Sequence, residues 1–432
     1  SLSSVIGWGI MGIELLVILT NFGIWFPGTN LIAYPKGTDD AKAVIAYMDQ
    51  QEQDTLFYRA ETSHSQTLND GALNGYNGVS TFTSSANVKV TQFMKVLGYG
   101  AKNTYNRYCF EESSPISNLF LNLKYMIERQ GRVKENPYFD DVYSSGKVHL
   151  LENNAYLPLG FLAQNQLLDL DFSSGKNTFE FQNELFRSAT GVQEDVWTPM
   201  AGKNLSISGT GVNLSVQSQT GYCSYTTDSS ENGTVYYKYI AENNGFVCTA
   251  LNLSKKNKYT FYKNGESLYS ESYSIPQSLA ICQVAPGDII EVRLTCSAGE
   301  KGNITLNTYL LDESLFWTGY EVLNASTLNL TTFQNTLIEG TIDCNRNGVL
   351  YTSIPQDGNW TAYVDDKPAQ IVMIGEAMIG LLLSEGSHAV TFRYHNPAFS
   401  LGWKISLACF VVFVGLYLSI YHPQGKKGKY ER

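Results

Sequence analysis

An apolar run at each end of the chain constrains its fold more than any other feature of the sequence. The first run, residues 5–26, reads VIGWGIMGIELLVILTNFGIWF and contains one charged residue, Glu14. At about 1.5 Å per residue, a helix of this length crosses a hydrocarbon core of roughly 30 Å. The second run, residues 401–421, carries only Lys404, which lies near enough to its start to reach the lipid headgroups. We therefore expect two transmembrane helices, residues 1–26 and 401–421, anchored in one lipid bilayer.

The basic tail, residues 422–432, predicts the orientation of these helices. It holds four cations directly after the second run: Lys426, Lys427, Lys429 and Arg432. The positive-inside rule then puts the C-terminus in the cytoplasm, and residues 27–400 are expected to be extracytoplasmic on a multi-pass protein of the cell membrane. A signal peptide is the alternative for the first run, but that run lacks a basic n-region and an A-x-A-like cleavage site.

Two polar residues inside the first run indicate that this helix has neighbours. Glu14 and Asn21 are seven residues apart and share one helical face. A charged carboxylate in the bilayer costs a few kcal/mol unless it faces protein or water. The pair forms either a polar site within a larger helical bundle or hydrogen bonds between helices. The chain also begins inside an apolar helix, so we expect it to be the C-terminal portion of a longer protein whose upstream transmembrane helices are partners of this one.

The composition indicates folded domains and argues against nucleic-acid binding. The chain has 432 residues, of which 43% are apolar and 16% charged. It is too apolar to stay disordered and too long for a single core. Its net charge of −10 at pH 7 has the wrong sign for a protein that binds phosphate backbones. Nucleic acid is therefore not an expected partner.

The outer part begins with mixed helical and strand-like patterns. Helical spacing occurs in residues 38–51 and again in residues 84–98, where four apolar residues share one face and Gly98 is a natural stop: Val90, Phe93, Met94 and Leu97. Residues 55–61 alternate like a strand, and residues 118–128 and 147–154 read as strands or short apolar elements. These patterns predict an extracytoplasmic α/β domain over residues 27–165 and a linker with a helix over residues 166–199.

Beyond the linker the pattern changes to short alternating runs separated by turn residues, as in β-sandwiches. A repeat is visible within it. GTVYYKY from Gly233 corresponds to GTIDCNR from Gly340, and YTFYKNGE from Tyr259 corresponds to WTAYVDDK from Trp360. We therefore expect two β-sandwich-like modules, residues 200–310 and 311–400. The predicted fold class is membrane-anchored α+β, with two transmembrane helices flanking an extracytoplasmic α/β domain and the two modules.

The residues that usually carry catalysis or bind metals form no familiar pattern. The cysteines have no CxxC spacing, and the five histidines include no HExxH motif. Nucleotide-binding and hydrolase motifs such as Walker A and GxSxG are absent from the sequence. We therefore predict no catalytic residue, metal ligand or cofactor within this chain. Disulfides remain possible in the outer part, most plausibly among Cys223, Cys248, Cys282 and Cys296, and free buried thiols are the alternative.

One segment, NDGALNGYNGVSTFTSS at residues 69–85, combines hydrogen-bonding groups with aromatic rings. This mixture suits the hydroxyl groups and the apolar face of a sugar ring. The candidate substrate-binding residues are Asn69, Asp70, Tyr76, Asn77, Ser80 and Phe82. The alternative is a series of Asn/Gly turns followed by an N-cap at Ser84 or Ser85 for the next helix.

Several of these motifs together resemble the YfhO family of large bacterial membrane proteins. The matching pieces include IELLVILTN, FYRAE, the segment 69–85, LFLNLKYMIE, FQNELFRSATG and LSEGSHAVTFRYHNPAFSLGWKISL, in the order of the family. The resemblance implies a membrane domain of the GT-C type upstream, as in glycosyltransferases that use polyprenyl-phosphate sugars. In such enzymes the catalytic acid lies in the first outer loop, so the resemblance places it outside this chain.

The function expected from this resemblance is that of the extracytoplasmic portion of a polyprenyl-phosphate-sugar-dependent glycosyltransferase that modifies surface polymers such as teichoic acids. Its expected partners are the lipid-linked sugar and the polymer. A non-catalytic cell-envelope protein, which binds polysaccharide or membrane partners through its β-modules, is the alternative. A transporter subunit is a third hypothesis, supported only by Glu14.

Overall fold

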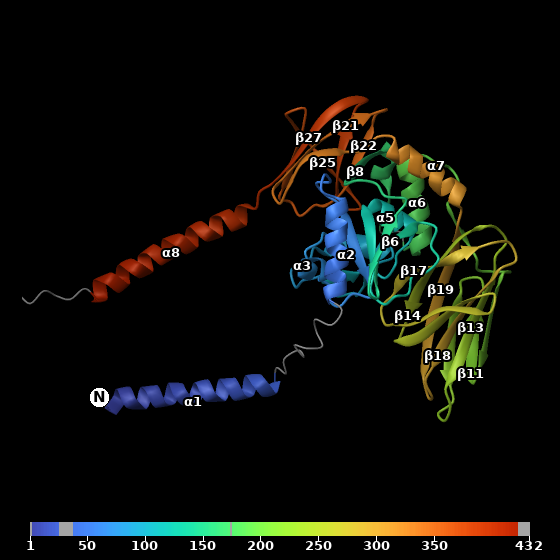
Figure 1. Cartoon of the computed structure of the whole chain (residues 1–432), viewed down its shortest axis with the longest axis horizontal. Coiled ribbons are helices and arrows are strands. Elements are labelled where there is room, and N and C mark those ends of the chain that lie inside the picture. The colour runs from blue at the N-terminus through green and yellow to red at the C-terminus, as the bar shows by residue number, and fades with distance from the viewer. Residues whose placement is uncertain (1, 26–37, 173–174, 422–432) are drawn as a thin grey trace, which may run out of the picture.

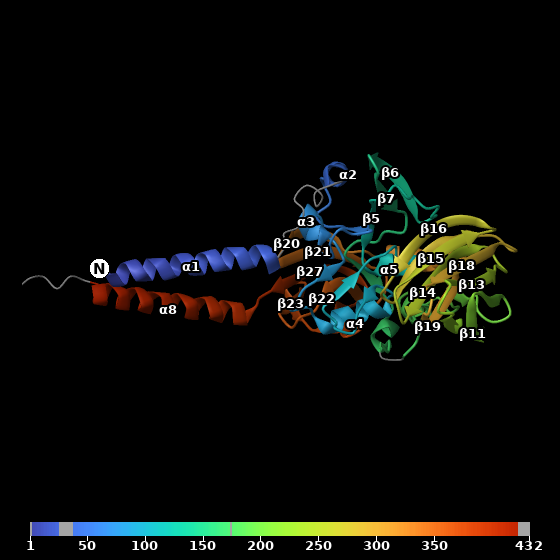
Figure 2. The same cartoon turned by 90° about the horizontal axis from the view of Figure 1, so that it is seen from below.

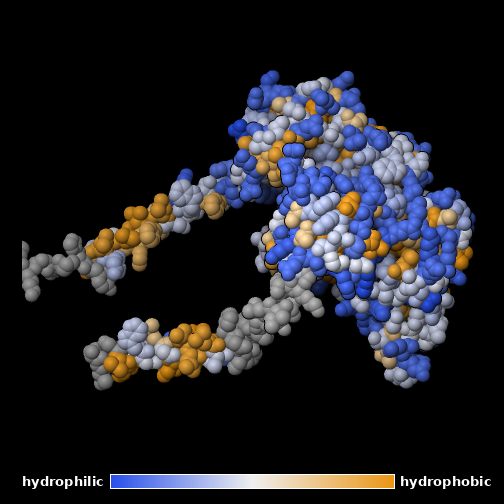
Figure 3. Space-filling view, in the orientation of Figure 1, coloured by the Kyte–Doolittle hydropathy of each residue, from blue (hydrophilic) through white to orange (hydrophobic). Residues whose placement is uncertain are grey.

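The computed structural model describes residues 2–25, 38–172 and 175–421. Two helices, α1 (Leu2–Trp25) and α8 (Pro397–Tyr421), project from the same side of the folded part (Figures 1 and 2). The surface of α8 is largely apolar, and so is part of the surface of α1 (Figure 3). The folded part leaves both helices uncovered.

One of these helices, over residues 397–420, is long and apolar enough to cross a membrane. It contains nearly all of the span expected at residues 401–421. The apolar stretch found in α1, Val5–Asn21, is shorter than the one in α8. A transmembrane span over residues 1–26 therefore stays a prediction. The tail at residues 422–432 lies outside the described residues.

The first folded part is an α/β unit whose main sheet has the strand order β1-β5-β7-β6. β1 and β5 are parallel, whereas β7 is antiparallel to both β5 and β6. A small sheet, β2-β4-β3, lies beside it. The elements are α2 (Thr38–Gln51), β1 (Arg59–Ser63), α3 (Asp70–Asn74), β2 (Thr81–Phe82), α4 (Val88–Val96), β3 (Gly100–Ala101), β4 (Arg107–Cys109), α5 (Pro115–Phe120), β5 (Leu123–Glu128), β6 (Phe139–Ser145) and β7 (Val148–Asn153).

Helix α4 forms where the apolar spacing predicted it, and the four residues of the expected face are all buried. Its N-cap is Asn87, whose side chain accepts hydrogen bonds from the backbone N–H groups of Lys89 and Val90. The expected cap at Ser84 or Ser85 was therefore wrong, because an Asn closer to the apolar run offers the same acceptor. Gly98 ends the helix with φ +103, and a Cβ there would collide with Ser278 of the first β-module.

The apolar stretch at residues 118–128 forms the end of helix α5 and the strand β5. α5 begins at Pro115, and the Ser114 hydroxyl accepts a hydrogen bond from the N–H of Ser117. The helix ends before Asn122, which has φ +57, and β5 follows. Proline at the first helical position and serine at the cap are favoured helix starts, so the local signal for α5 was present in the sequence.

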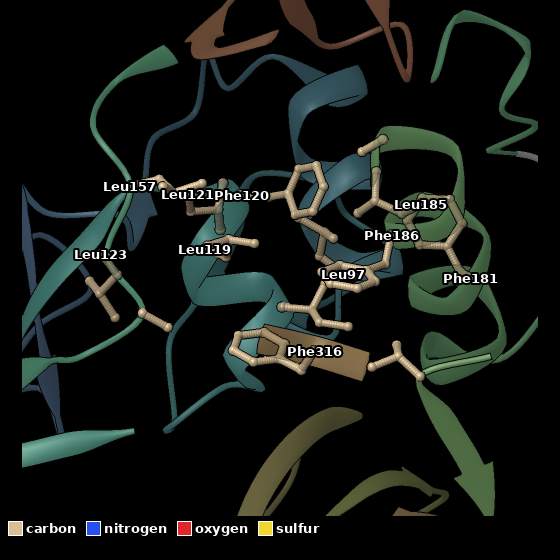
Figure 4. Packing of buried hydrophobic residues seen from close by; sticks show 14 of the residues in the cluster. Leu97, Leu119, Phe120, Leu121, Leu123, Leu157, Phe181, Leu185, Phe186 and Phe316 are labelled. Carbon is tan, nitrogen blue, oxygen red and sulfur yellow. The ribbon is translucent and has the colours of Figure 1, made fainter. Parts of the chain in front are cut away.

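The linker region carries η1 (Asn165–Asp169), α6 (Thr178–Thr190) and β9 (Trp197–Pro199). Asn177 and Glu180 form a capping box at the start of α6. Phe181, Leu185 and Phe186 of this helix pack into the largest apolar core, together with residues of α5 and Phe316 of α7 (Glu313–Asn324) (Figure 4). α6 is thus a central packing element of the folded part.

The first β-module is a sandwich of two sheets, with orders β10-β13-β18-β15-β16 and β11-β12-β19-β14-β17, and β9 pairs with β19. Buried side chains from both sheets form its core. Helix α7 (Glu313–Asn324) follows it. The strands are β10 (Leu205–Thr210), β11 (Val212–Gln217), β12 (Tyr222–Thr227), β13 (Gly233–Ile240), β14 (Gly245–Leu253), β15 (Asn257–Lys263), β16 (Glu266–Tyr273), β17 (Gln277–Val284), β18 (Ile289–Cys296) and β19 (Lys301–Leu311).

The second β-module repeats this plan with sheets β20-β21-β27-β23-β24 and β25-β26-β22-β8. Its inner strand β22 pairs with β26 on one side and β8 on the other, as β14 pairs with β17 and β19. The strands are β8 (Gly160–Ala163), β20 (Asn329–Gln334), β21 (Leu337–Cys344), β22 (Gly348–Pro355), β23 (Trp360–Val364), β24 (Lys367–Ala369), β25 (Ile371–Ile374), β26 (Met378–Leu383) and β27 (Gly386–Tyr394). The upstream segment at residues 160–163 therefore completes the second module.

The two β-modules also share the hydrogen bonding of one hairpin turn. Asn264 has φ +50 in the β15–β16 hairpin, and its side chain accepts a hydrogen bond from the N–H of Ile289 at 2.9 Å. Asp365 has φ +50 in the β23–β24 hairpin and accepts from the N–H of Ala389 at 3.0 Å. The same turn chemistry at corresponding positions confirms the internal repeat read from the sequence.

All seven cysteines are free, and the six that lie in the folded part are buried. The alternative of free buried thiols is therefore the correct one for the four residues considered for disulfides: Cys223, Cys248, Cys282 and Cys296. Burial raises the pKa of Cys282 and of Cys296 to about 12. These thiols are small apolar core residues with little thiolate character.

Candidate functional site

The segment at residues 69–85 folds around Glu61, a buried acid on β1. The Glu61 carboxylate accepts hydrogen bonds from the backbone N–H groups of Thr62, Val79 and Ser80 at 2.9, 2.7 and 2.5 Å. Burial raises the pKa of Glu61, and these hydrogen bonds oppose that rise. The sequence analysis did not single out Glu61, although an acidic residue in the strand-like sequence FYRAE could have indicated a buried carboxylate.

Three of the six predicted residues use their polar groups within the segment, on β1 or at the residue just before β1. The Asn69 side chain accepts from the N–H of Phe82 at 2.8 Å and donates to its carbonyl at 3.0 Å. The Tyr76 hydroxyl lies 2.6 Å from the hydroxyl of Thr62, and Asn77 donates to the carbonyl of Tyr58 at 3.2 Å. These contacts hold the segment against β1.

The other three predicted residues connect the segment to its surroundings. Asp70 is buried and lies 3.3 Å from the guanidinium of Arg129. The Ser80 hydroxyl accepts a hydrogen bond from the N–H of Phe110 at 2.9 Å. Phe82 is 44% exposed, with the Arg107 guanidinium 5.7 Å from its ring centroid. All six residues thus come together in one folded unit, and their contact with a glycan stays a prediction.

A group of charged side chains lies where β1 and β5 end. His64 has φ +59, and its ring nitrogens lie 3.3 Å from Glu271 and 3.8 Å from Glu128. Arg132 also pairs with Glu271 at 2.5 Å. Because Glu271 belongs to β16, these contacts join the α/β unit to the first β-module. They are a charged interface between two parts of the fold.

Glu111 lies near this interface and is electrostatically coupled to it. Its pKa is raised to about 7 by burial first, then by the nearby carboxylates of Glu112 and Glu271, while Lys134 opposes the rise. Lys134 forms an ion pair with Glu112 at 2.5 Å. Glu111 therefore changes its charge near neutral pH, in contrast to an ordinary surface glutamate.

A groove of about 1100 Å³ lies between the α/β unit and both β-modules. One wall is α4 and the loop after it, and another is the loop before α6. β14, β17 and β19 of the first module and β25 of the second complete the lining. Segments from widely separated parts of the sequence meet here, so the groove has no contiguous sequence signature.

The groove combines amide groups, aromatic rings and cations. Its amides include Gln92, Asn103, Asn252, Gln277 and Asn307, and its rings include Phe93, Tyr105 and Phe172. The cations are Lys89, Lys95 and Lys176. Lys89 and Lys176 form ion pairs with Glu376 and Glu184, and Lys95 donates to Asn103 at 2.9 Å. Such a lining suits a ligand with many hydroxyl groups.

None of the six residues predicted at residues 69–85 lines this groove. The groove residues escaped sequence reasoning because they come from α4, a loop and strands of both modules, each with an ordinary composition. Glu14 and Asn21, the predicted intramembrane polar residues, lie on α1 with exposed side chains. Across residues 2–25, 38–172 and 175–421, no group of three or more His, Cys, Asp or Glu residues could hold a metal ion.

A family model described as the bacterial membrane protein YfhO matches residues 26–406 of the chain. The chain belongs to the YfhO family. The match covers the α/β unit, the linker helix and both β-modules of this YfhO chain, and it reaches into α8. Together with the apolar helix at residues 397–420, it makes this YfhO chain a membrane-associated protein.

Solved structures with some likeness to this YfhO chain include a mutant of the carbohydrate-binding module CBM29-2, with 15% identity and a TM-score of 0.21, covering 27% of this chain and 91% of that one. Another CBM29-2 mutant, complexed with mannohexaose, has 18% identity, a TM-score of 0.20 and coverages of 26% and 89%. A Paenibacillus cycloisomaltooligosaccharide glucanotransferase complexed with cycloisomaltoheptaose has 10% identity, a TM-score of 0.20 and coverages of 53% and 50%. No curated protein matches the chain significantly.

Proposed function

We propose that this chain is the polymer-engaging extracytoplasmic portion of a glycosyltransferase that uses polyprenyl-phosphate sugars and modifies surface polymers such as teichoic acids. The transfer chemistry belongs to residues upstream of this chain. The observation that carries the proposal is the groove of about 1100 Å³, lined by amides and aromatic rings. Its role is to hold the acceptor polymer.

The groove matches a sugar polymer in its size and chemistry. Cavities of about 300–1,000 Å³ take drug-sized molecules, so this groove has room for several sugar units. Amide side chains both donate to and accept from hydroxyl groups, and aromatic rings cover the apolar face of a sugar. Tyr105 and Phe172 are half-buried and can serve this role, whereas Phe93 is buried. Asn252 is exposed and Gln92 half-buried, so both are accessible to a ligand.

The proposed topology places this groove outside the cytoplasm. α1 and α8 project from the same side of the folded part, as two spans of one bilayer would (Figure 1). The positive-inside rule predicts that the basic tail lies in the cytoplasm and the folded part on the opposite side of the membrane. Glu14 and Asn21 then face upstream helices of the same protein. The segment at residues 69–85, with its exposed Phe82, is a further proposed contact for the polymer.

The proposal is tested with the double variant Gln92→Ala/Asn103→Ala in the complete protein. Both side chains line the groove, one from α4 and one from the β3–β4 loop. We expect binding of the purified surface polymer to fall about tenfold, since two polar contacts are lost, while lipid-linked sugar binding is unchanged. The matched control is Asn243→Ala/Asn244→Ala, two exposed amides in the β13–β14 loop. Equal loss of polymer and lipid-linked sugar binding would count against the proposal.

One observation favours a purely binding role as a second candidate. Two of the three lysines in the groove are already paired with carboxylates and the third donates to Asn103, so the groove offers a ligand mainly uncharged amide and ring contacts. A non-catalytic envelope protein that binds polysaccharide fits this feature. Cells that lack the protein would then glycosylate their surface polymers normally, whereas the first proposal requires that this modification be lost.

A further inference from the structure

A second cavity of about 640 Å³ lies on the first β-module. We refer to it as the β-module hollow. It is formed by β11, β12 and β19 and by the residues that follow β14. Its polar lining includes Ser215, Ser224, Ser254, Asn303, Lys255 and Lys301. The hollow has no residue in common with the larger groove.

Strand register explains why these side chains meet. Ser215 lies opposite Ser224 in the β11–β12 pair, and Ser224 lies opposite Asn303 in the β12–β19 pair. Directly opposed residues of antiparallel strands point to the same face of the sheet. Three neighbouring strands therefore present hydroxyl and amide groups in one row across this face. Thr226 and Lys301, also opposite each other, form the next row.

The hollow differs from the rest of the molecule in its charge. Its lining contains Lys255 and Lys301 and no carboxylate, although the whole chain has a net charge of −10. Glu300, which lies beside Lys301 in the chain, accepts hydrogen bonds from Tyr225 and Asn257, both at 2.8 Å. Its second oxygen accepts from the N–H of Ser297 at 2.8 Å. The Glu300 carboxylate is close enough to Lys255 for their charges to interact. Neither Lys255 nor Lys301 forms an ion pair among the described residues, so both ammonium groups can still contact an anion.

The same sheet face leads from the hollow to the larger groove. Along β19, Asn303 lines the hollow and Asn307 lines the groove. Residues two apart in a strand share a face, so Asn303, Thr305 and Asn307 form one polar line of roughly 14 Å at 3.4 Å per residue. Asn252 of β14 lies opposite Thr305 and also lines the groove. An extended chain could occupy both sites along this line.

We propose that the β-module hollow is a second binding site, specific for negatively charged units of a hydroxyl-rich polymer whose chain continues into the groove. The inference rests on the proposed function in one respect, because the same polymer occupies both sites. It adds the place where the anionic groups of that polymer bind, and it extends the ligand class to any polyol or glycan that carries phosphate or carboxylate groups. The serines and Asn303 bind hydroxyls, and Lys255 and Lys301 bind the anionic groups.

The position of the hollow favours a polymer over a lipid headgroup. The first β-module lies at the end of the molecule opposite to α1 and α8 (Figures 1 and 2). If these helices mark the membrane, the hollow lies on the module that is most distant from it. An anionic bilayer surface attracts cations only within about a Debye length, roughly 8 Å at physiological salt. A membrane lipid would not reach this site.

The test compares Lys255→Gln/Lys301→Gln with the wild type in the complete, detergent-solubilised protein. The control is Lys238→Gln/Lys258→Gln, two exposed lysines on the other sheet of the same module. The probes are polygalacturonate, a glycerol-phosphate oligomer, neutral dextran, and vesicles that contain phosphatidylglycerol. For the two anionic polymers we expect a loss of affinity of roughly tenfold, which shrinks as salt is added, with dextran and vesicle binding unchanged.

Three results would overturn the proposal: unchanged binding of both anionic polymers, an equal loss in the control variant, or a loss confined to vesicle binding. Failure of the proposed function gives a different pattern. In that case Gln92→Ala/Asn103→Ala would leave polymer binding intact, while the lysine variant could still lose the anionic probes. Thermal unfolding of each variant identifies any that has lost its fold.

Discussion

At the scale of single residues, the most consequential side chain of the core is the fully buried amide of Gln182. It donates to the carbonyl of Leu97 at 2.9 Å and to the hydroxyl of Ser117 at 3.1 Å. It accepts from the hydroxyl of Ser114 at 2.9 Å and from the indole N–H of Trp197 at 3.0 Å. One amide thus joins α6 to the end of α4, to α5 and to β9, with its hydrogen-bonding capacity filled.

Replacing this amide by an apolar side chain of similar size is expected to be costly. Gln182→Leu leaves the Trp197 indole N–H and the Leu97 carbonyl without this partner in a dry core, and the free energy of unfolding should fall by about 3 kcal/mol. Chemical denaturation measures the change. Gln193→Leu is the control, since Gln193 is exposed and should change stability by less than about 0.5 kcal/mol. Similar losses in the two variants would contradict this account of the network.

Glu111 predicts a pH dependence of stability with a definite sign. Its folded-state pKa, raised to about 7 by burial and then by Glu112 and Glu271, lies above the unfolded value of about 4.3. Between these two values the folded state binds more protons than the unfolded state, so the free energy of unfolding falls as pH rises through this window. Glu111→Gln removes this contribution.

The measurement is the difference in unfolding free energy between wild type and Glu111→Gln across the window from acidic to neutral pH. The wild type should lose stability relative to the variant as pH rises. Titrating groups that are not coupled to Glu111 are common to both proteins and cancel in the difference, whereas Glu61, Glu112 and Glu271 are coupled to Glu111 and contribute to it. A difference that stays constant with pH would show that Glu111 titrates normally.

At the scale of elements, β8 shows how a short strand can belong to a distant core. Phe161 and Leu162 are neighbours in β8 and point to opposite faces of its sheet. Phe161 packs in the largest apolar core, against Phe120 of α5, and Leu162 packs with residues of the second β-module. The module has no strand after β27 to fill this place, because the chain continues into α8. β8 fills it from upstream.

Truncation of Leu162 should therefore loosen the second module. Leu162→Ala is expected to lower the free energy of unfolding by about 2–5 kcal/mol, because it leaves a cavity in a packed core. Backbone hydrogen exchange should speed up in β22 and β26. Leu382→Ala is the matched control on the same sheet, since Leu382 is 58% exposed. Faster exchange confined to the α/β unit would refute the assignment of β8 to the second module.

Local patterns predicted some elements, and contacts distant in sequence determined the rest. The buried face of α4 and the end of this helix at Gly98 could be predicted from the sequence, because helix periodicity and a left-handed glycine are local signals. The repeat predicted which strands of the two modules correspond, because each half contains its own turns and alternation. The pairing of β8 with β22 was not readable, since nearly two hundred residues separate these strands. The groove could not be predicted for the same reason, since its residues are distant in sequence. The polar composition of residues 69–85 suggested a binding site, although most of these polar groups form hydrogen bonds within the fold.

At the scale of the whole molecule, the two apolar helices and the first β-module lie at opposite ends (Figure 2). The groove lies between them, at the junction of the α/β unit with both modules. A polymer that enters at the β-module hollow and follows the polar line of β19 would approach the groove from the membrane-distal end. This arrangement requires that the folded part and the basic tail lie on different sides of the bilayer.

The cysteines provide a direct test of this topology. The six outer cysteines are buried and only Cys409 is exposed, so Cys409→Ser gives a background that a membrane-impermeant maleimide should scarcely label. Ser229→Cys adds a thiol at an exposed turn of the first module, and Lys429→Cys adds one in the tail. In intact, wall-stripped cells we expect the first to be labelled and the second to react only after lysis, because the reagent does not cross the bilayer. The reverse pattern would put the folded part in the cytoplasm, where a lipid-linked sugar on the outer face could not serve it, and the proposed role in surface-polymer modification would fail with it.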